Sequence, residues 1–289
     1  MTMNMDAINQ VAGADIPADR CLTLAVTSGK GGVGKSSLSV NLALRLGAAG
    51  KKIIVLDADL GLANLDVLFG IRPHHTLWHV LQGKKRLLDI VQPINRNVRL
   101  IAGGSGIANL ADLPTESRMD FLRSLAQLRQ YADVMLIDTG AGLSSNVIEF
   151  LNYADEVLLI STPEPTAMAD AYGVVKTLAR NSEEFPKVSV VVNRVASAAE
   201  AQGVSSRLIS VARQFLNVEV GYKGYVLDDP NVSKAVRAQK PFTEVYPDSR
   251  ASLCLSRLAE SYGAQQPLRK PQSGQSFLNT LVGLMTGKR

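Results

Sequence analysis

The chain has 289 residues, a formal net charge of +5, and 46% apolar and 20% charged residues. This composition is ordinary for a soluble globular protein, and the length fits one α/β domain with extensions. The mild positive charge permits contact with nucleic acid or anionic lipid without indicating either. The two cysteines, Cys21 and Cys254, exclude a disulfide scaffold and a C-x-x-C metal or iron–sulfur site within the chain, and favour a reducing compartment.

The chain begins with a polar segment, residues 1–20, that we expect to be flexible. It has no apolar stretch of signal-peptide type, and no later run approaches the roughly 18 apolar residues of a spanning helix. An apolar run, Leu22–Val26, then predicts a strand, and residues 38–46 have a helical pattern.

Between that strand and that helix lies the sequence GKGGVGKSS, residues 29–37, which fits G-x-x-x-x-G-K-[ST]. Glycines allow successive backbone N–H groups to point at phosphate oxygens, and the following helix N-terminus adds partial positive charge. Lys35 is expected to reach the β- and γ-phosphates, and the Ser36 hydroxyl to bind Mg²⁺. The expected nucleotide contacts of the loop are Gly29, Lys30, Gly31, Gly32, Val33, Gly34, Lys35, Ser36 and Ser37.

A second apolar run, residues 52–56, ends in Asp57-Ala58-Asp59 and predicts a buried parallel strand. Carboxylates directly after such a strand lie at the sheet edge where open α/β folds bind ligands. Single Asp residues at this place are usually helix caps. Two of them, Asp57 and Asp59, beside a phosphate loop favour Mg²⁺ binding or the handling of water.

A third strong strand, residues 133–138, ends in Asp138, and an apolar run ending in Asp is typical of a Walker B motif. Asp138 is therefore expected to serve Mg²⁺, and residues 139–142 to form a loop that responds to the γ-phosphate. The glycines of residues 102–106 lack a lysine and predict a turn or a loop near the nucleotide edge.

Strand and helix patterns alternate through the rest of the chain, which predicts a doubly wound, mostly parallel α/β sheet flanked by helices. The expected strands are 98–101, 156–161, 188–192 and 218–227, and the expected helices are 76–82, 115–131, 166–180, 197–215, 231–239 and 248–262.

The C-terminal part divides into a linker, residues 263–275, rich in Gln, Pro, Ser and Gly, and a tail, residues 276–289. Apolar residues of the tail fall on one face of a helix: Phe277, Leu278, Leu281, Leu284 and Met285. Two interpretations stay open. The tail packs on its own domain or on a partner, or it lies in the surface of an anionic membrane, which the detaching linker favours.

Residues 22–262 resemble the MinD/ParA family of phosphate-loop ATPases with a deviant Walker A motif. Lys30, directly after the first glycine, carries this resemblance, together with Asp57-Ala58-Asp59-Leu60-Gly61-Leu62-Ala63-Asn64-Leu65-Asp66 and Asp138-Thr139-Gly140-Ala141-Gly142. Within the family, the chain is similar to the flagellar-number regulators FlhG, FleN and YlxH. The cell-division protein MinD shares the Asp-x-Asp pattern and the amphipathic tail.

The resemblance implies a MinD-like ATPase domain over residues 21–262 that binds ATP and Mg²⁺, forms a homodimer with ATP and hydrolyses it slowly. Lys30 would cross to the partner's phosphates, and Lys35 and Asp59 would complete catalysis, Asp59 by orienting water. Ser36, Asp57 and Asp138 would serve Mg²⁺, and Asn193, Leu227 and Asp229 would contact adenine. The family often has proline where this chain has Leu227, so the base contacts rest on a weaker match.

For its biology, the resemblance implies an ATP-switched regulator of the number and placement of polar flagella. Its expected location is cytoplasmic, reversibly at the inner face of the cell membrane and at the pole. The implied partners are an FlhF-type GTPase, flagellar switch (C-ring) proteins or a flagellar transcription activator, and an anionic membrane surface. The alternatives are a MinD-type regulator of the division site and a ParA-type DNA-partition ATPase. Specific nucleic-acid binding is not expected, because no stripe of lysine or arginine is present.

Overall fold

The computed structural model describes residues 21–104, 115–182 and 184–263. The N-terminal segment of residues 1–20, the tail of residues 276–289 and almost all of the linker lie outside these residues, so the expectations for them stay predictions. Within the described part of the chain, no helix is both long and apolar enough to cross a membrane.

The described residues form one eight-stranded sheet with the strand order β3-β4-β2-β5-β1-β6-β7-β8. Every neighbouring pair is parallel except β3 with β4. The strands are β1 (Leu22–Thr27), β2 (Ile53–Ala58), β3 (Gln92–Pro93), β4 (Val98–Ile101), β5 (Val134–Thr139), β6 (Glu156–Ser161), β7 (Val188–Val195) and β8 (Val220–Leu227).

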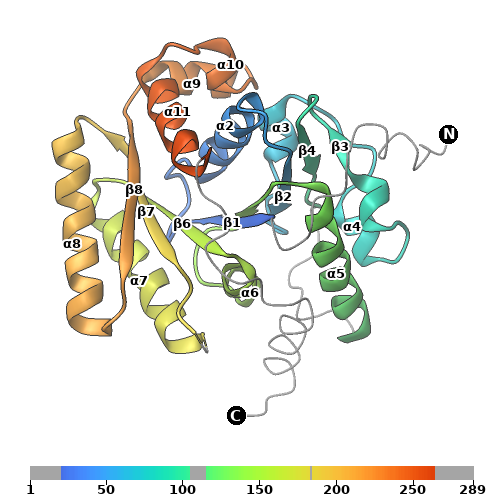
Figure 1. Ribbon diagram of the computed structural model, residues 1–289, viewed down its shortest axis with the longest axis horizontal. Coiled ribbons are helices and arrows are strands. Elements are labelled where there is room, and N and C mark those ends of the chain that lie inside the picture. Colours follow the sequence, from blue (N-terminus) through green and yellow to red (C-terminus); the bar gives the residue numbers. More distant parts are fainter. Residues whose placement is uncertain (1–20, 105–114, 183, 264–289) are drawn as a thin grey trace.

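Helices cover both faces of this sheet (Figure 1). They are α2 (Lys35–Ala48), α3 (Leu65–Phe69), α4 (Leu77–Leu81), α5 (Thr115–Leu128), α6 (Ser145–Tyr153), α7 (Pro165–Asn181), α8 (Ala198–Leu216), α9 (Pro230–Arg237), α10 (Phe242–Val245) and α11 (Arg250–Gly263), with the 3-10 helices η2 (Leu87–Ile90) and η4 (Arg129–Tyr131). The predicted doubly wound α/β architecture is thus confirmed.

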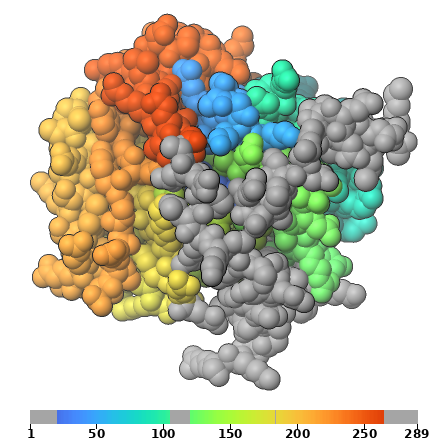
Figure 2. All heavy atoms as spheres, in the orientation of Figure 1, coloured from blue at the N-terminus to red at the C-terminus, as the bar shows by residue number. Residues whose placement is uncertain are grey.

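The strands are continuous apolar runs because both of their faces are buried. Successive residues of β1 show this: Leu24 belongs to the core under α2 and α11, and Ala25 to the core under α5, α6, α7 and α8. Both side chains are fully buried. On the first of these faces, α11 in red lies beside α2 in blue (Figure 2).

The sheet order brings the ends of β1, β2 and β5 to one edge. β5 lies between β1 and β2, and the register places Asp57 of β2 directly beside Asp138 of β5. Asp138 also pairs in register with Val26 of β1, just before the glycine loop. The topology therefore collects the three predicted motifs, far apart in the sequence, at the carboxyl edge of neighbouring strands, where open α/β sheets bind their ligands.

Three short elements, α10, η2 and β3, were not predicted. They have two to four residues each, too few to show a hydrophobic period. β3 is an edge strand that contains Pro93, which has no N–H to donate to a further strand. The other predicted strands and helices are confirmed to within a few residues at their ends, with α4 shorter than expected and η4 completing the helix expected to reach Tyr131.

Candidate functional site

The glycine loop joins β1 to α2 and surrounds the N-terminus of that helix. Gly34 precedes α2 with φ of 93°, a left-handed conformation that glycine adopts without strain. A Cβ at this position would also overlap the side-chain amide of Asn193. The sequence therefore needs glycine here for two reasons, and the loop curls so that the first turn of α2 faces an open cavity.

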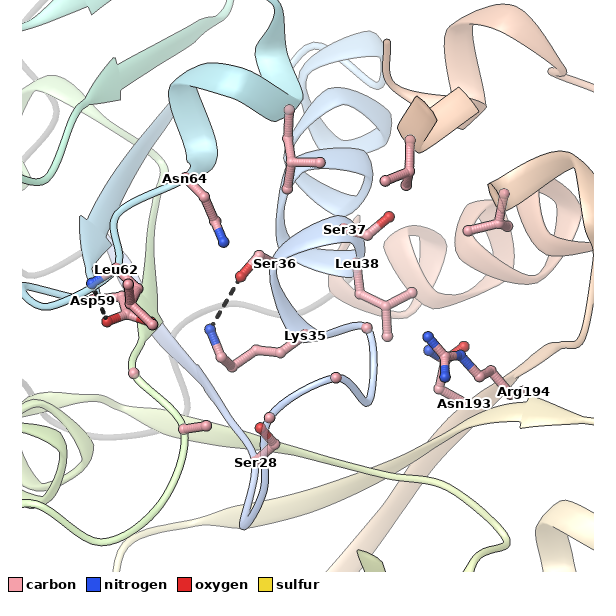
Figure 3. A pocket seen from close by; sticks show the side chains of 18 of the residues that line it. Ser28, Lys35, Ser36, Ser37, Leu38, Asp59, Leu62, Asn64, Asn193 and Arg194 are labelled. Atoms are coloured by element: carbon pink, nitrogen blue, oxygen red, sulfur yellow. Dashed lines mark hydrogen bonds between the residues drawn. The ribbon is translucent and has the colours of Figure 1, made fainter. Parts of the chain in front are cut away.

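This cavity encloses about 940 Å³ and extends from the loop to α9 and α10. In Figure 3, Lys35 and Ser36 lie at its centre, Asp59 and Leu62 on one side, and Asn193 and Arg194 on the other. The predicted site residues that line it are Gly31, Gly32, Gly34, Lys35, Ser36, Ser37, Asp59, Asn193, Leu227 and Asp229.

Five predicted residues do not line the cavity. Val33 packs into the core, and Gly29 faces the backbone of Asp170 on α7. Lys30 points to the start of α7, where it donates to Glu164 and Thr166. Asp57 and Asp138 lie behind Ser36 and Lys35, with 1% and 0% of their surfaces exposed.

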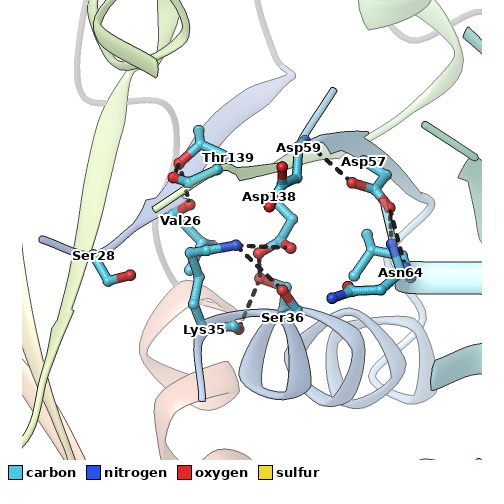
Figure 4. Close-up of polar contacts among 12 residues, drawn as sticks. Val26, Ser28, Lys35, Ser36, Asp57, Asp59, Asn64, Asp138 and Thr139 are labelled. Atoms are coloured by element: carbon cyan, nitrogen blue, oxygen red, sulfur yellow. Dashed lines mark hydrogen bonds and ion pairs between the residues drawn. The ribbon is translucent and has the colours of Figure 1, made fainter. Parts of the chain in front are cut away.

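The lysine of the loop is held by a carboxylate from the neighbouring strand (Figure 4). Lys35 Nζ lies 3.1 Å from Asp138 Oδ2 and 3.2 Å from Ser36 Oγ. The other oxygen of Asp138 accepts a hydrogen bond of 2.6 Å from Ser39 Oγ. Lys35 and Asp138 are buried and Ser36 is half-buried, and the three side chains form a connected group beside the cavity that Lys35 and Ser36 line.

Asp57 organises the loop that follows β2. Its Oδ1 accepts from the Asp59 N–H, and its Oδ2 accepts from the N–H groups of Asn64 and Leu65, each at 3.0 Å. Burial, and the nearby charge of Asp138, raise the pKa of Asp57 to about 7 even though these hydrogen bonds oppose the shift. Two buried carboxylates side by side are a place where a cation would relieve repulsion.

The residues fit a magnesium ion only in company with a ligand. Asp57, Asp138 and Ser36 supply oxygen donors of the type that Mg²⁺ prefers. Within the described ranges, however, no group of three His, Cys, Asp or Glu side chains is arranged to hold a metal ion by itself. Mg²⁺ usually keeps several water molecules and takes further oxygens from substrate phosphates, which matches a site with few protein ligands.

Asp59 is placed differently from the two buried acids. It lines the cavity, and its Oδ1 accepts a 3.1 Å hydrogen bond from the Leu62 N–H. Gly140, in the loop after β5, approaches so closely that a Cβ there would lie 3.5 Å from Asp59 Oδ1. A carboxylate at this place can accept a hydrogen bond from a water molecule in the cavity.

The far end of the cavity is formed by residues around Asn193 and Asp229. Asn193 Nδ2 donates to the Val33 carbonyl at 2.7 Å, so this amide fixes the glycine loop. Asp229 accepts from the N–H groups of Asn231 and Ala251. Burial of Asp229 opposes ionisation, but these hydrogen bonds outweigh it and lower the pKa of the carboxyl. Both side chains therefore have structural partners while they line the cavity.

Several residues that line the cavity were not predicted from the sequence as site residues. Arg194 follows Asn193 with φ of 57°, in the left-handed region that is unusual for a non-glycine residue. Further lining residues are Asn64, Ser144, Asn146, Val232, Val236, Arg237 and Phe242. The helix expected over residues 231–239 corresponds to α9, but no local sequence pattern showed that this helix faces the phosphate loop.

A glycine loop on a helix N-terminus, a buried lysine paired with a strand-end aspartate and a large adjoining cavity define a phosphate-loop nucleotide-binding protein. A sequence profile of the CobQ/CobB/MinD/ParA nucleotide binding domain matches residues 24–242. The chain thus belongs to the MinD/ParA family, whose members include ATPases.

The chain is similar to two known bacterial proteins over most of its length. The antiactivator FleN of Pseudomonas aeruginosa is 38% identical over 237 residues, which cover 82% of this chain and 84% of FleN. The flagellum site-determining protein YlxH of Helicobacter pylori is 35% identical over 82% of this chain and 80% of YlxH. Among solved structures, the cell division ATPase MinD of Pyrococcus furiosus is similar with a TM-score of 0.68 and 24% identity, covering 84% of this chain and 98% of MinD. That last likeness concerns the fold.

Proposed function

We propose that this protein is an ATP-driven switch that regulates the number and placement of bacterial flagella. One observation carries the proposal: an intact phosphate loop, with Asp59 on the same cavity, occurs in a chain 38% identical to FleN and 35% identical to YlxH over 82% of its length. ATP binding would change the conformation of the protein and its binding partners, and ATP hydrolysis would reverse that change.

ATP would bind with its phosphates on the glycine loop and its base toward Asn193, Leu227 and Asp229. The size of the cavity and the buried Lys35 ammonium support this placement. Ser36 and Asp138 would hold Mg²⁺, with Asp57 contributing through water, and the bound ion would neutralise charge on the phosphates. Lys35 would leave Asp138 for the β- and γ-phosphates, because a metal ion on Asp138 removes the need for the lysine as counter-ion.

Asp59 would orient the water molecule that attacks the γ-phosphate, which its position in the cavity supports. Lys30 would complete the site of a second subunit. Its ammonium lies away from the cavity of its own chain and has a side-chain exposure of 31%, so it is accessible to a partner. A cation aimed at phosphoryl oxygens stabilises the charge of the transition state. Hydrolysis would then be slow and dependent on pairing.

The tail of residues 276–289 would attach the protein reversibly to an anionic membrane surface. One amphipathic helix gives weak binding, and two on one dimer bind more tightly through effective concentration. ATP would thereby control residence at the inner face of the cell membrane. An FlhF-type GTPase, switch-complex proteins or a flagellar transcription activator are the proposed partners of the ATP-bound dimer.

A chromosomal deletion tests the biological part of the proposal. We expect cells without the protein to carry an abnormal number or placement of flagella and to divide at normal sites, and the wild-type gene to restore the pattern. A Lys35→Ala gene should not restore it. Normal flagella in the deletion strain would contradict the proposal.

A second function, selection of the division site, is favoured by one observation: the septum site-determining protein MinD of Bacillus subtilis is 29% identical over 249 residues, which cover 85% of this chain. The same deletion strain distinguishes the two, because loss of a division-site regulator produces minicells. A DNA-partition role predicts ATP-dependent DNA binding that weakens as salt is raised.

A further inference from the structure

Lys30 is bound within its own chain by the start of α7. Its ammonium donates a hydrogen bond of 2.5 Å to Glu164 Oε2 and another of 3.0 Å to Thr166 Oγ1. The two acceptors are 134 and 136 residues away in the sequence, so this contact is built by the fold. Lys30, which is proposed to reach a second subunit, is thus hydrogen-bonded within its own subunit.

The acceptors are held at a fixed place relative to the phosphate loop. Glu164 is the N-cap residue of α7 and precedes Pro165, which restricts the backbone at the first helical position. The same helix packs so closely on the loop that a Cβ at Gly29 would overlap the backbone of Asp170. Glu164 and Thr166 therefore sit directly beside the residue that follows Gly29.

The charge around Lys30 favours this contact. The hydrogen bond and the charge of Lys30 lower the pKa of the Glu164 carboxyl, and Arg194 acts in the same direction. Glu164 is thus ionised near neutral pH. With side-chain exposures of 31% for Lys30 and 57% for Glu164, the pair is open to solvent and can be broken at small cost.

We propose that Glu164, assisted by Thr166, is a clasp that holds Lys30 in its own subunit and sets the protein concentration at which ATP drives pairing. This inference rests on the proposed function, because it concerns the same lysine. Release of the clasp exchanges a carboxylate partner for the more strongly charged phosphates of the second subunit's nucleotide. Glu164 is a positioning residue in this account, since it acts through Lys30.

Zero-length crosslinking tests the contact itself. A carbodiimide activates the Glu164 carboxylate, the Lys30 amine attacks the acyl carbon, and an amide forms as the urea leaves. We expect mass spectrometry to find a Lys30–Glu164 amide within single chains of the nucleotide-free protein. Mg²⁺ and ATP should reduce its yield at concentrations where the protein pairs. An undiminished yield in protein that has paired would overturn the clasp.

The effect on pairing is measured by analytical ultracentrifugation with ATP. An exposed ion pair shifts an equilibrium by up to about fivefold, so breaking one in each subunit shifts it by up to about 25-fold. Glu164→Gln should lower the protein concentration for half-maximal pairing within this range. Asp170→Asn, which removes a charge from the same helix without touching the clasp, should leave it unchanged. Lys30→Ala with Glu164→Gln should match Lys30→Ala alone.

These experiments distinguish failure of the clasp proposal from failure of the proposed ATP-driven switch. Weaker pairing of Glu164→Gln than of wild type would mean that Glu164 supports the paired state, which overturns the clasp. Wild-type protein that stays monomeric with ATP overturns the proposed switch, whereas absence of the nucleotide-free crosslink overturns the clasp alone.

Discussion

Lys35 Nζ and Asp138 Oδ2 lie 3.1 Å apart as an ion pair with side-chain exposures of 8% and 1%. The pair joins the phosphate loop to β5 across 103 residues of sequence. Each charge is buried, so each depends on the other for stability in the absence of nucleotide. The loop is therefore preformed, with its lysine held at the base of the cavity.

Removal of Lys35 should destabilise the nucleotide-free protein. Lys35→Ala leaves the Asp138 charge buried, with the Ser39 hydroxyl still donating a hydrogen bond to it, and loss of one partner of a buried pair costs about 3–5 kcal/mol. Denaturant unfolding measures this, with the exposed Lys240→Ala as control. Adding Asp138→Asn to Lys35→Ala should recover part of the loss, because it removes the unpaired charge. Equal stability of Lys35→Ala and Lys240→Ala would contradict the pair's role.

Gly29 and Gly31 should respond differently to the same substitution. A Cβ at Gly29 overlaps the backbone of Asp170, whereas at Gly31 nothing lies within 4 Å. Gly29→Ala must displace α7 from the loop, and we expect a loss of about 1–3 kcal/mol as for other overpacked positions. The free energy of unfolding of Gly31→Ala should lie within about 0.5 kcal/mol of the wild-type value. Thermal or denaturant unfolding of both variants provides the comparison, and equal losses would argue against the close packing of α7.

Asn193 should affect nucleotide binding through the loop as well as through the base. Its amide donates to the Val33 carbonyl within the core, so Asn193→Ala loses a hydrogen bond worth about 1 kcal/mol and frees the loop. We expect weaker binding of ATP and of inorganic triphosphate, measured by calorimetry. If only ATP binding weakens, the residue acts on adenine alone.

Cys21 should be inert in the folded protein. Burial raises the pKa of its thiol to about 12 from 9.0, so at pH 8 the thiolate fraction is roughly a thousandfold below that of an ordinary cysteine. Below pH 12, each unit of pH increase raises this fraction about tenfold. In a Cys254→Ala variant, iodoacetamide should label Cys21 slowly at pH 8 and quickly in denaturant. Rapid labelling of native protein would contradict the buried position.

The fold could be predicted from the sequence because its strands are continuous apolar runs that end in functional residues. Asp57, Asp59 and Asp138 could be assigned to one edge by this rule alone. The protonation behaviour and the hydrogen-bond partners of each carboxylate could not be predicted. The raised pKa of Asp57 depends on its register beside Asp138, and that register follows from strand order rather than from local sequence.

Contacts between segments that are distant in the sequence could not be predicted from the sequence either. Asn193 matches an adenine-recognition position in the resemblance, yet its bond to Val33 appears only when β7 lies beside the loop. The partner of Lys30 could not be found from the sequence, because Glu164 follows a strand and precedes a helix as many capping residues do. The proposal that two subunits share each site rests on that lysine, which leads to the most direct test.

Mixing two inactive variants tests whether each site is shared between subunits. Lys30→Ala and Asp59→Ala should each have little ATP turnover alone. If Asp59 serves its own subunit and Lys30 the other, each mixed dimer has one complete site, and half of the dimers in an equal mixture are mixed. Turnover should then return to about a quarter of the wild-type rate. A mixture no more active than the separate variants would contradict the account of an ATP-driven dimeric switch.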